Sequence, residues 1–130
     1  MVPIVYLTVD QVLEYHQDAL GFGGSAGVRS EHLLASAVFQ PQQSAFGEDA
    51  YPTIGGKAAA YCFFIAKNHA FVDGNKRTAA AAMLAFLELN GHELNAGDDD
   101  TATSIEAMAA DATGQGEFFD WICHRASPKA

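Results

Sequence analysis

The chain has 130 residues, of which 49% are hydrophobic and 18% charged, and its formal net charge is −9 at pH 7. This length suits one independently folding domain, residues 1–130, and the composition excludes a disordered chain. Seven Lys and Arg against 16 Asp and Glu exclude general binding to nucleic acid or to an anionic membrane surface, because phosphate contacts need many cations.

Helix signals open the chain, and the period-two runs of Val, Ile and Thr that mark strands are missing. Thr8 and Gln11 form a capping box at the start of a first helix, and a run of glycines from Gly21 ends it. Val12, Leu13, His16 and Leu20 follow one another at helical spacing on this segment. A second helix is predicted over residues 30–39.

Two apolar helices are predicted in the middle of the chain, over residues 54–68 and 75–90, and Gly91 supplies a left-handed stop for the second. Residues 58–66 are apolar on all sides, which is typical of a helix at the centre of a domain. The sequence therefore predicts an all-α bundle in which two buried central helices flank the segment 69–74.

The C-terminal third predicts two further helices, over residues 101–113 and 117–125, with Asp98–Asp100 as a loop and helix-entry cluster. We expect the last two residues, Lys129 and Ala130, to fray. Residues 42–53 read as a polar loop with two alternatives, a plain connector or a flap whose edge holds a target peptide by main-chain pairing.

Cys62 and Cys123 stand in apolar surroundings without metal-ligand spacing, which predicts two buried free thiols in a cytosolic protein. Asp10 and Glu14 interrupt the N-terminal region where a secretory signal would be apolar. The apolar runs of the central helices are too short to span a bilayer. We expect a cytoplasmic protein with no membrane partner.

The most informative segment runs from His69 to Ala79 and reads HAFVDGNKRTA. Gly74 and Asn75 stand where a helix begins, so free N–H groups and the helix dipole favour a phosphate there. Lys76 adds a compact positive charge, and Arg77, in the first turn, suits bidentate contact with phosphate oxygens.

The same segment holds two groups with a chemical role. Asp73, beside the phosphate cradle, is placed to bind Mg²⁺ that bridges phosphates, and His69 is the base available near pH 7. Four of the seven cations (Lys57, Lys67, Lys76 and Arg77) lie near or within the segment, which suits a small polyanion such as ATP. The pattern indicates transfer of a phosphate-bearing group from a nucleotide.

The pattern His-x-Phe-x-Asp-Gly-Asn-Lys-Arg-Thr-Ala resembles the Fic/Doc superfamily, and most of all its death-on-curing branch, the Doc toxins. Weaker similarity extends over nearly the whole chain, including residues 21–29 and 33–37. The resemblance implies a compact helical bundle and assigns roles by position. His69 matches the catalytic base, Asp73 the Mg²⁺ ligand, Gly74 and Asn75 the phosphate-binding turn, and Arg77 the phosphate-binding arginine.

Lys76 bears on the reaction, because Fic enzymes that transfer AMP usually carry Gly at this position. Doc-type members carry Lys and are similar to kinases, binding ATP so that the γ-phosphate is transferred. The resemblance implies a Thr hydroxyl of a translation elongation factor as substrate and a cognate antitoxin as partner. Gly at position 74 is more typical of Fic enzymes than of Doc-type members, so an adenylyltransferase stays open as an alternative. A second alternative is a catalytically inactive nucleotide- or protein-binding module.

Overall fold

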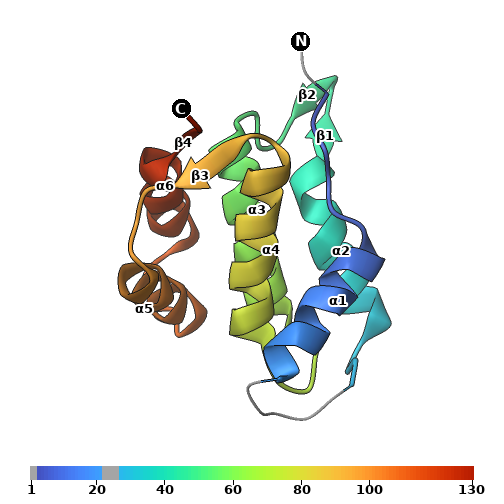
Figure 1. The fold of residues 1–130 in the computed structure, drawn as a ribbon. Helices are drawn as coiled ribbons and strands as arrows, with labels where there is room; N and C mark the ends of the chain where they lie inside the picture. The colour runs from blue at the N-terminus through green and yellow to red at the C-terminus, as the bar shows by residue number, and fades with distance from the viewer. Residues whose placement is uncertain (1–2, 22–26) are drawn as a thin grey trace.

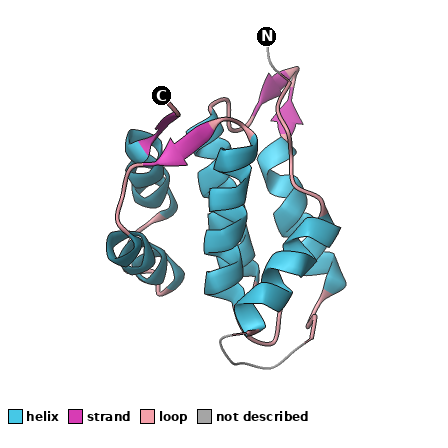
Figure 2. Cartoon of the chain, viewed as in Figure 1, coloured by secondary structure: helices cyan, strands magenta, loops and turns pink. Residues whose placement is uncertain are grey.

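The computed structural model of the chain describes residues 3–21 and 27–130. Within these residues it contains six α-helices and two short strand pairs (Figures 1 and 2), which confirms the predicted all-α class. Part of the glycine run predicted to end the first helix lies outside the described residues. The helices are α1 (Val9–Leu20), α2 (Glu31–Phe39), α3 (Ile54–Asn68), α4 (Asn75–Leu89), α5 (Asp98–Ala109) and α6 (Gln115–Arg125).

The two predicted central helices, α3 and α4, run side by side through the middle of the bundle and are joined by residues 69–74 (Figure 1). Helices α1 and α2 cover one side of this pair, and α5 and α6 cover the other. Small side chains let α3 pack closely on its neighbours, and a buried aromatic fills the centre. The buried run of α3 contains Ala58, Ala59, Ala60, Tyr61, Cys62, Ile65 and Ala66.

Local capping signals in the sequence are found where they were predicted. The Thr8 side chain accepts from the Gln11 N–H at 3.2 Å, and the Gln11 side chain accepts from the Thr8 N–H at 2.8 Å. Ser30 caps α2, and Gly91 has a φ of +69° just after α4. Such signals depend on residues three or four apart, so a sequence reveals them without knowledge of the fold.

The predicted starts of the last two helices are wrong by a few residues. Helix α5 begins at Asp98, three residues earlier than predicted, so the acidic cluster forms its first turn. Carboxylates are favourable there because the N-terminal end of a helix carries partial positive charge. Helix α6 likewise begins at Gln115 and not at Glu117.

The strand pairs have no counterpart in the sequence prediction. Strand β3 (His92–Leu94) pairs antiparallel with β4 (Ala126–Pro128), and the Lys129 N–H donates to the Gly91 carbonyl at 2.9 Å. The prediction that Lys129 frays is therefore wrong. Strands of two or three residues are too short to show a period of two, and this pair joins segments more than 30 residues apart.

The loop at 42–53 contains a hairpin, with β1 (Ser44–Ala45) paired to β2 (Glu48–Asp49). This hairpin lies at the N-terminal end of α3, whereas the motif follows the C-terminal end of that 15-residue helix, about 22 Å away (Figure 1). The interpretation of residues 42–53 as a flap beside the site is wrong. Residues 27 and 28 lie beside the motif instead, since Val28 pairs with Phe71 in an antiparallel bridge.

Two further predictions about single residues need correction. Lys57 is fully buried near the start of α3, where its ammonium donates to the Asp49 carboxylate at 3.0 Å and to the Tyr51 carbonyl. It therefore anchors the hairpin, away from the motif. Cys62 is buried as predicted, but Cys123 is exposed on α6. Among the described residues, no helix is long and apolar enough to cross a membrane.

Candidate active site

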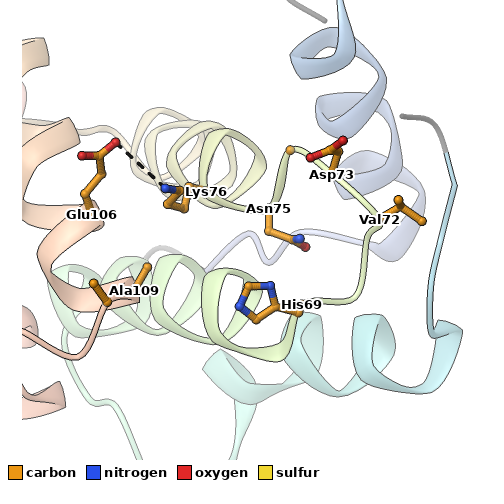
Figure 3. A pocket seen from close by; sticks show the side chains of 9 residues that line it. His69, Val72, Asp73, Asn75, Lys76, Glu106 and Ala109 are labelled. Atoms are coloured by element: carbon orange, nitrogen blue, oxygen red, sulfur yellow. Dashed lines mark ion pairs between the residues drawn. The ribbon is translucent and has the colours of Figure 1, made fainter. Parts of the chain in front are cut away.

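The turn after α3 is built on His69, which closes the helix in the left-handed region, at φ +49° and ψ +47°. A residue with a side chain rarely adopts this conformation, so other contacts must hold it. The Arg29 Nε–H donates to the His69 carbonyl at 2.8 Å, and the N–H groups of Arg29 and Ser30 donate to the Ala70 carbonyl. The imidazole of His69 is thereby directed into an open hollow (Figure 3).

Phe71 and Asn75 brace the loop from inside. Phe71 is 1% exposed and anchors the loop in the core. The Asn75 Oδ1 accepts from the Phe71 N–H at 3.1 Å, and the Asn75 Nδ2 donates to the Phe71 carbonyl at 3.0 Å. Because both ends of its amide bond the backbone, the Asn75 side chain holds the turn and leaves anion binding to main-chain groups.

The N-terminal end of α4 provides those main-chain groups. Gly74 is the N-cap, with a φ of +81° that a residue with a Cβ adopts only at a cost of about 1–2 kcal/mol. No side chain of the described residues caps this end. The Thr78 N–H donates to the Gly74 carbonyl, so the N–H groups of residues 75–77 precede the helical hydrogen-bond ladder. With the helix dipole behind them, they suit an anion.

These groups open into one hollow of about 370 Å³ between the motif and α5. Five of the six predicted site residues line it, and Glu106 and Ala109 of α5, with Ala110 just after that helix, close its far side (Figure 3). The predicted residues present are His69, Asp73, Gly74, Asn75 and Lys76.

The structure places the sixth predicted residue, Arg77, outside this hollow. Its guanidinium donates to the Ala19 carbonyl at the end of α1 at 3.3 Å. Arg77 lines a neighbouring hollow of about 280 Å³ between α4 and α5, which shares Lys76 and Glu106 with the first. The backbone of Arg77 still belongs to the N-terminal turn of α4.

Glu106 is a site residue that the sequence analysis missed. Its carboxylate faces the Lys76 ammonium at 4.0 Å across the hollow (Figure 3), with side chains 70% and 55% exposed. An ion pair this exposed contributes at most about 1 kcal/mol to stability. The pair does place the negative charge of Glu106 beside the Lys76 ammonium, which is expected to bind phosphate. Thirty residues separate the two, so no local pattern indicated the pair.

His16 and Arg29 were also missed as parts of the site. His16 is 4% exposed, and its Nε2–H donates to the Asp73 carbonyl at 2.8 Å. Its ring lies parallel to that of Phe71, with 3.7 Å between centroids. In the sequence, His16 falls at helical spacing among the apolar residues of the first helix. A polar residue on this apolar face is the one sequence signal for its role.

The carboxylate of Asp73 is exposed beside the α4 N-terminus, which fits a hard cation such as Mg²⁺. No group of three His, Cys, Asp or Glu within residues 3–21 and 27–130 forms a cage for a metal. Mg²⁺ commonly binds through one or two carboxylates, with substrate phosphates and water completing the shell. Asp73 thus suits a cation that arrives with a nucleotide.

The fold and the site together define a class of helical proteins in which a loop between two central helices carries a His, an Asp and a phosphate-binding helix start. The Fic/DOC family model matches residues 6–87, and the chain belongs to this family. This membership supports a transferase activity in general. The chain is also 45% identical over 108 residues to a curated protein of Mycolicibacterium smegmatis named Toxin Doc, a match that covers 83% of this chain and 81% of that protein.

Proposed function

We propose that this protein is a Doc-like toxin of a toxin–antitoxin system that transfers the γ-phosphate of ATP to a Thr hydroxyl of a translation elongation factor. The observation that carries the proposal is that His69, Asp73, Lys76 and the N-terminus of α4 line one hollow. The similarity to a protein named Toxin Doc supports the biological role.

In the proposed reaction the hydroxyl oxygen attacks the γ-phosphorus. A new O–P bond forms, the bond from the γ-phosphorus to the bridging oxygen breaks, and ADP leaves. His69 takes the hydroxyl proton, and the amides of residues 75–77 with Lys76 hold the phosphates and offset their charge. Asp73 would hold Mg²⁺, which when bound would neutralise charge on the phosphate oxygens.

Lys76 favours phosphate transfer over the alternative, transfer of AMP. The Lys76 side chain occupies space at the N-terminal end of α4 that a Gly would leave open to phosphates. The triphosphate must then bind in a different arrangement from that in an enzyme with Gly at this position. A labelling experiment separates the candidates. Label from γ-labelled ATP on a protein in a cell extract supports the kinase, whereas label from α-labelled ATP supports the adenylyltransferase.

The third candidate, a binding module without catalysis, predicts that nucleotide binds and that neither label is transferred. The clustering of His69, Asp73 and Lys76 in one hollow counts against it. His69→Ala protein is the control in all arms, since labelling that persists in this variant does not come from the proposed site.

We further propose that the neutralising antitoxin places a segment against α1. A second hollow, of about 350 Å³, lies between α1 and residues 27–28, with Leu13, Leu20 and Val28 among its walls. A disordered tail that folds on binding suits such an apolar surface. Expression of this protein alone should arrest growth, and coexpression of a small protein encoded by the neighbouring gene should relieve the arrest. Harmless expression of catalytically active protein would contradict the toxin role.

A further inference from the structure

We propose that His16, on α1, is a positioning residue for the loop at residues 69–74: its hydrogen bond to the Asp73 carbonyl sets the direction of the proposed metal-binding carboxylate and of the Gly74 amide. This inference rests on the proposed function, in which Asp73 holds Mg²⁺ on the nucleotide. His16 touches neither nucleotide nor target in that scheme and acts through the peptide that it binds.

Two contacts hold His16 against the loop. Its Nε2–H donates to the Asp73 carbonyl at 2.8 Å, across 57 residues of sequence. Its ring stacks on Phe71 at an interplanar angle of 8°. The ring also lies close to Gly74, because a Cβ added there would lie 3.5 Å from the His16 Cδ2. With 4% of its surface exposed, His16 has little freedom to leave this arrangement.

The planarity of the peptide bond links the direction of the Asp73 carbonyl to that of the Gly74 N–H. The Asp73 carbonyl and the Gly74 N–H belong to one trans peptide unit and point in opposite directions. While the carbonyl is held toward α1, the Gly74 N–H must point away from α1. The hydrogen bond from His16 also restrains the backbone of Asp73, which carries the carboxylate. Gly74 has a φ of +81°, a conformation with few steric restraints of its own, so an external bond has the more influence on it.

The matched variants are His16→Gln and His16→Leu. A Gln side chain places an amide N–H at about the reach of Nε2, whereas Leu keeps an apolar side chain and removes the donor. Val12→Ala, at a fully buried position one turn earlier on α1, is the control for loss of stability alone. Circular dichroism and thermal unfolding show which variants fold.

The main readout is calorimetric binding of Mn²⁺ in the presence of a non-hydrolysable ATP analogue, followed by kcat and KM for phosphate transfer. Loss of a group that orients a metal ligand commonly weakens metal binding or activity roughly 10- to 100-fold. We expect a loss of this size in His16→Leu, expressed in kcat and Mn²⁺ affinity more than in KM for the protein target. His16→Gln should recover most of it, and Val12→Ala should bind Mn²⁺ like the wild type.

The outcomes separate the inference from the proposed function. If the wild type binds no Mn²⁺–nucleotide, the metal role of Asp73 fails, and the inference fails with it. If the wild type binds and folded His16→Leu binds equally well, the inference alone is overturned. An equal loss in Val12→Ala and His16→Leu, or no recovery in His16→Gln, would also overturn it, because the effect would then come from stability. If His16→Leu does not fold, folded His16→Gln decides the question. Retained Mn²⁺ binding supports the inference, and lost Mn²⁺ binding overturns it.

Discussion

Replacing Asn75 by Ala removes the side-chain brace of the loop at residues 69–74 and leaves His69 and Lys76 unchanged. Asn75 makes two hydrogen bonds to the backbone of the buried Phe71, at 3.1 and 3.0 Å. Each is worth about 0.5–1.5 kcal/mol net, and more where the partner left behind stays buried. We therefore expect Asn75→Ala to lower the free energy of unfolding by roughly 2 kcal/mol.

This loss can be converted into a melting temperature. For a domain of 130 residues the entropy of unfolding is about 0.27 kcal/mol/K near 60 °C, so 2 kcal/mol lowers Tm by roughly 7 °C. Thermal unfolding followed by circular dichroism measures the shift. Phosphate transfer should fall more than stability alone explains at 25 °C, because the amides of residues 75–77 lose their fixed direction.

Val72→Ala is the matched control, because Val72 lies in the same loop and is 55% exposed. Its truncation should change the free energy of unfolding by less than about 0.5 kcal/mol. If Asn75→Ala and Val72→Ala shift Tm equally, the two hydrogen bonds do not brace the loop, and the reasoning is refuted.

Four further outcomes follow from single residues. His69→Ala should fold normally and lose roughly 10²- to 10⁴-fold in transfer rate, and near-full activity in the purified variant would remove His69 from the mechanism. The wild type should add about 80 Da to its target by intact-mass analysis, and Lys76→Gly should weaken this reaction; a gain of about 329 Da with wild-type enzyme would favour adenylylation. Burial raises the pKa of Tyr61 from 10.0 to about 12, so the folded state favours the protonated phenol. That stability is present below pH 10 and lost between pH 10 and 12, so the urea midpoint should fall there more steeply in wild type than in Tyr61→Phe. A thiol reagent should label the exposed Cys123 in folded protein and reach the buried Cys62 only after unfolding, since burial also raises the pKa of that thiol; rapid native labelling of both would contradict the packing of α3.

Much of the fold was readable from the sequence because its signals are local. The bounds of α3, residues 54–68, were predicted correctly from an apolar run between a polar loop and the motif. The capping box at Thr8 and the left-handed stop at Gly91 depend only on neighbours in the chain. Five of the six predicted site residues share one hollow because they stand within eight positions on a single turn.

What the tertiary structure alone decided involves segments far apart in the chain. The pairing of β3 with β4, the ion pair of Lys57 with the hairpin, and the turn of Arg77 toward α1 each depend on which elements meet. A polar side chain shows its chemistry in the sequence but not its partner, because packing sets the direction in which it points.

The loop at residues 69–74 shows this division most clearly. The sequence by itself determined which groups it carries: an imidazole at His69, a carboxylate at Asp73 and a helix start at Asn75. The tertiary structure decided how they are held, through Arg29 on the His69 carbonyl and His16 on the Asp73 carbonyl. These bonds span 40 and 57 residues, and they form only once α1 and the start of α2 pack against the central helices. Hydrogen-bond partners brought together by folding leave no period or spacing in a sequence.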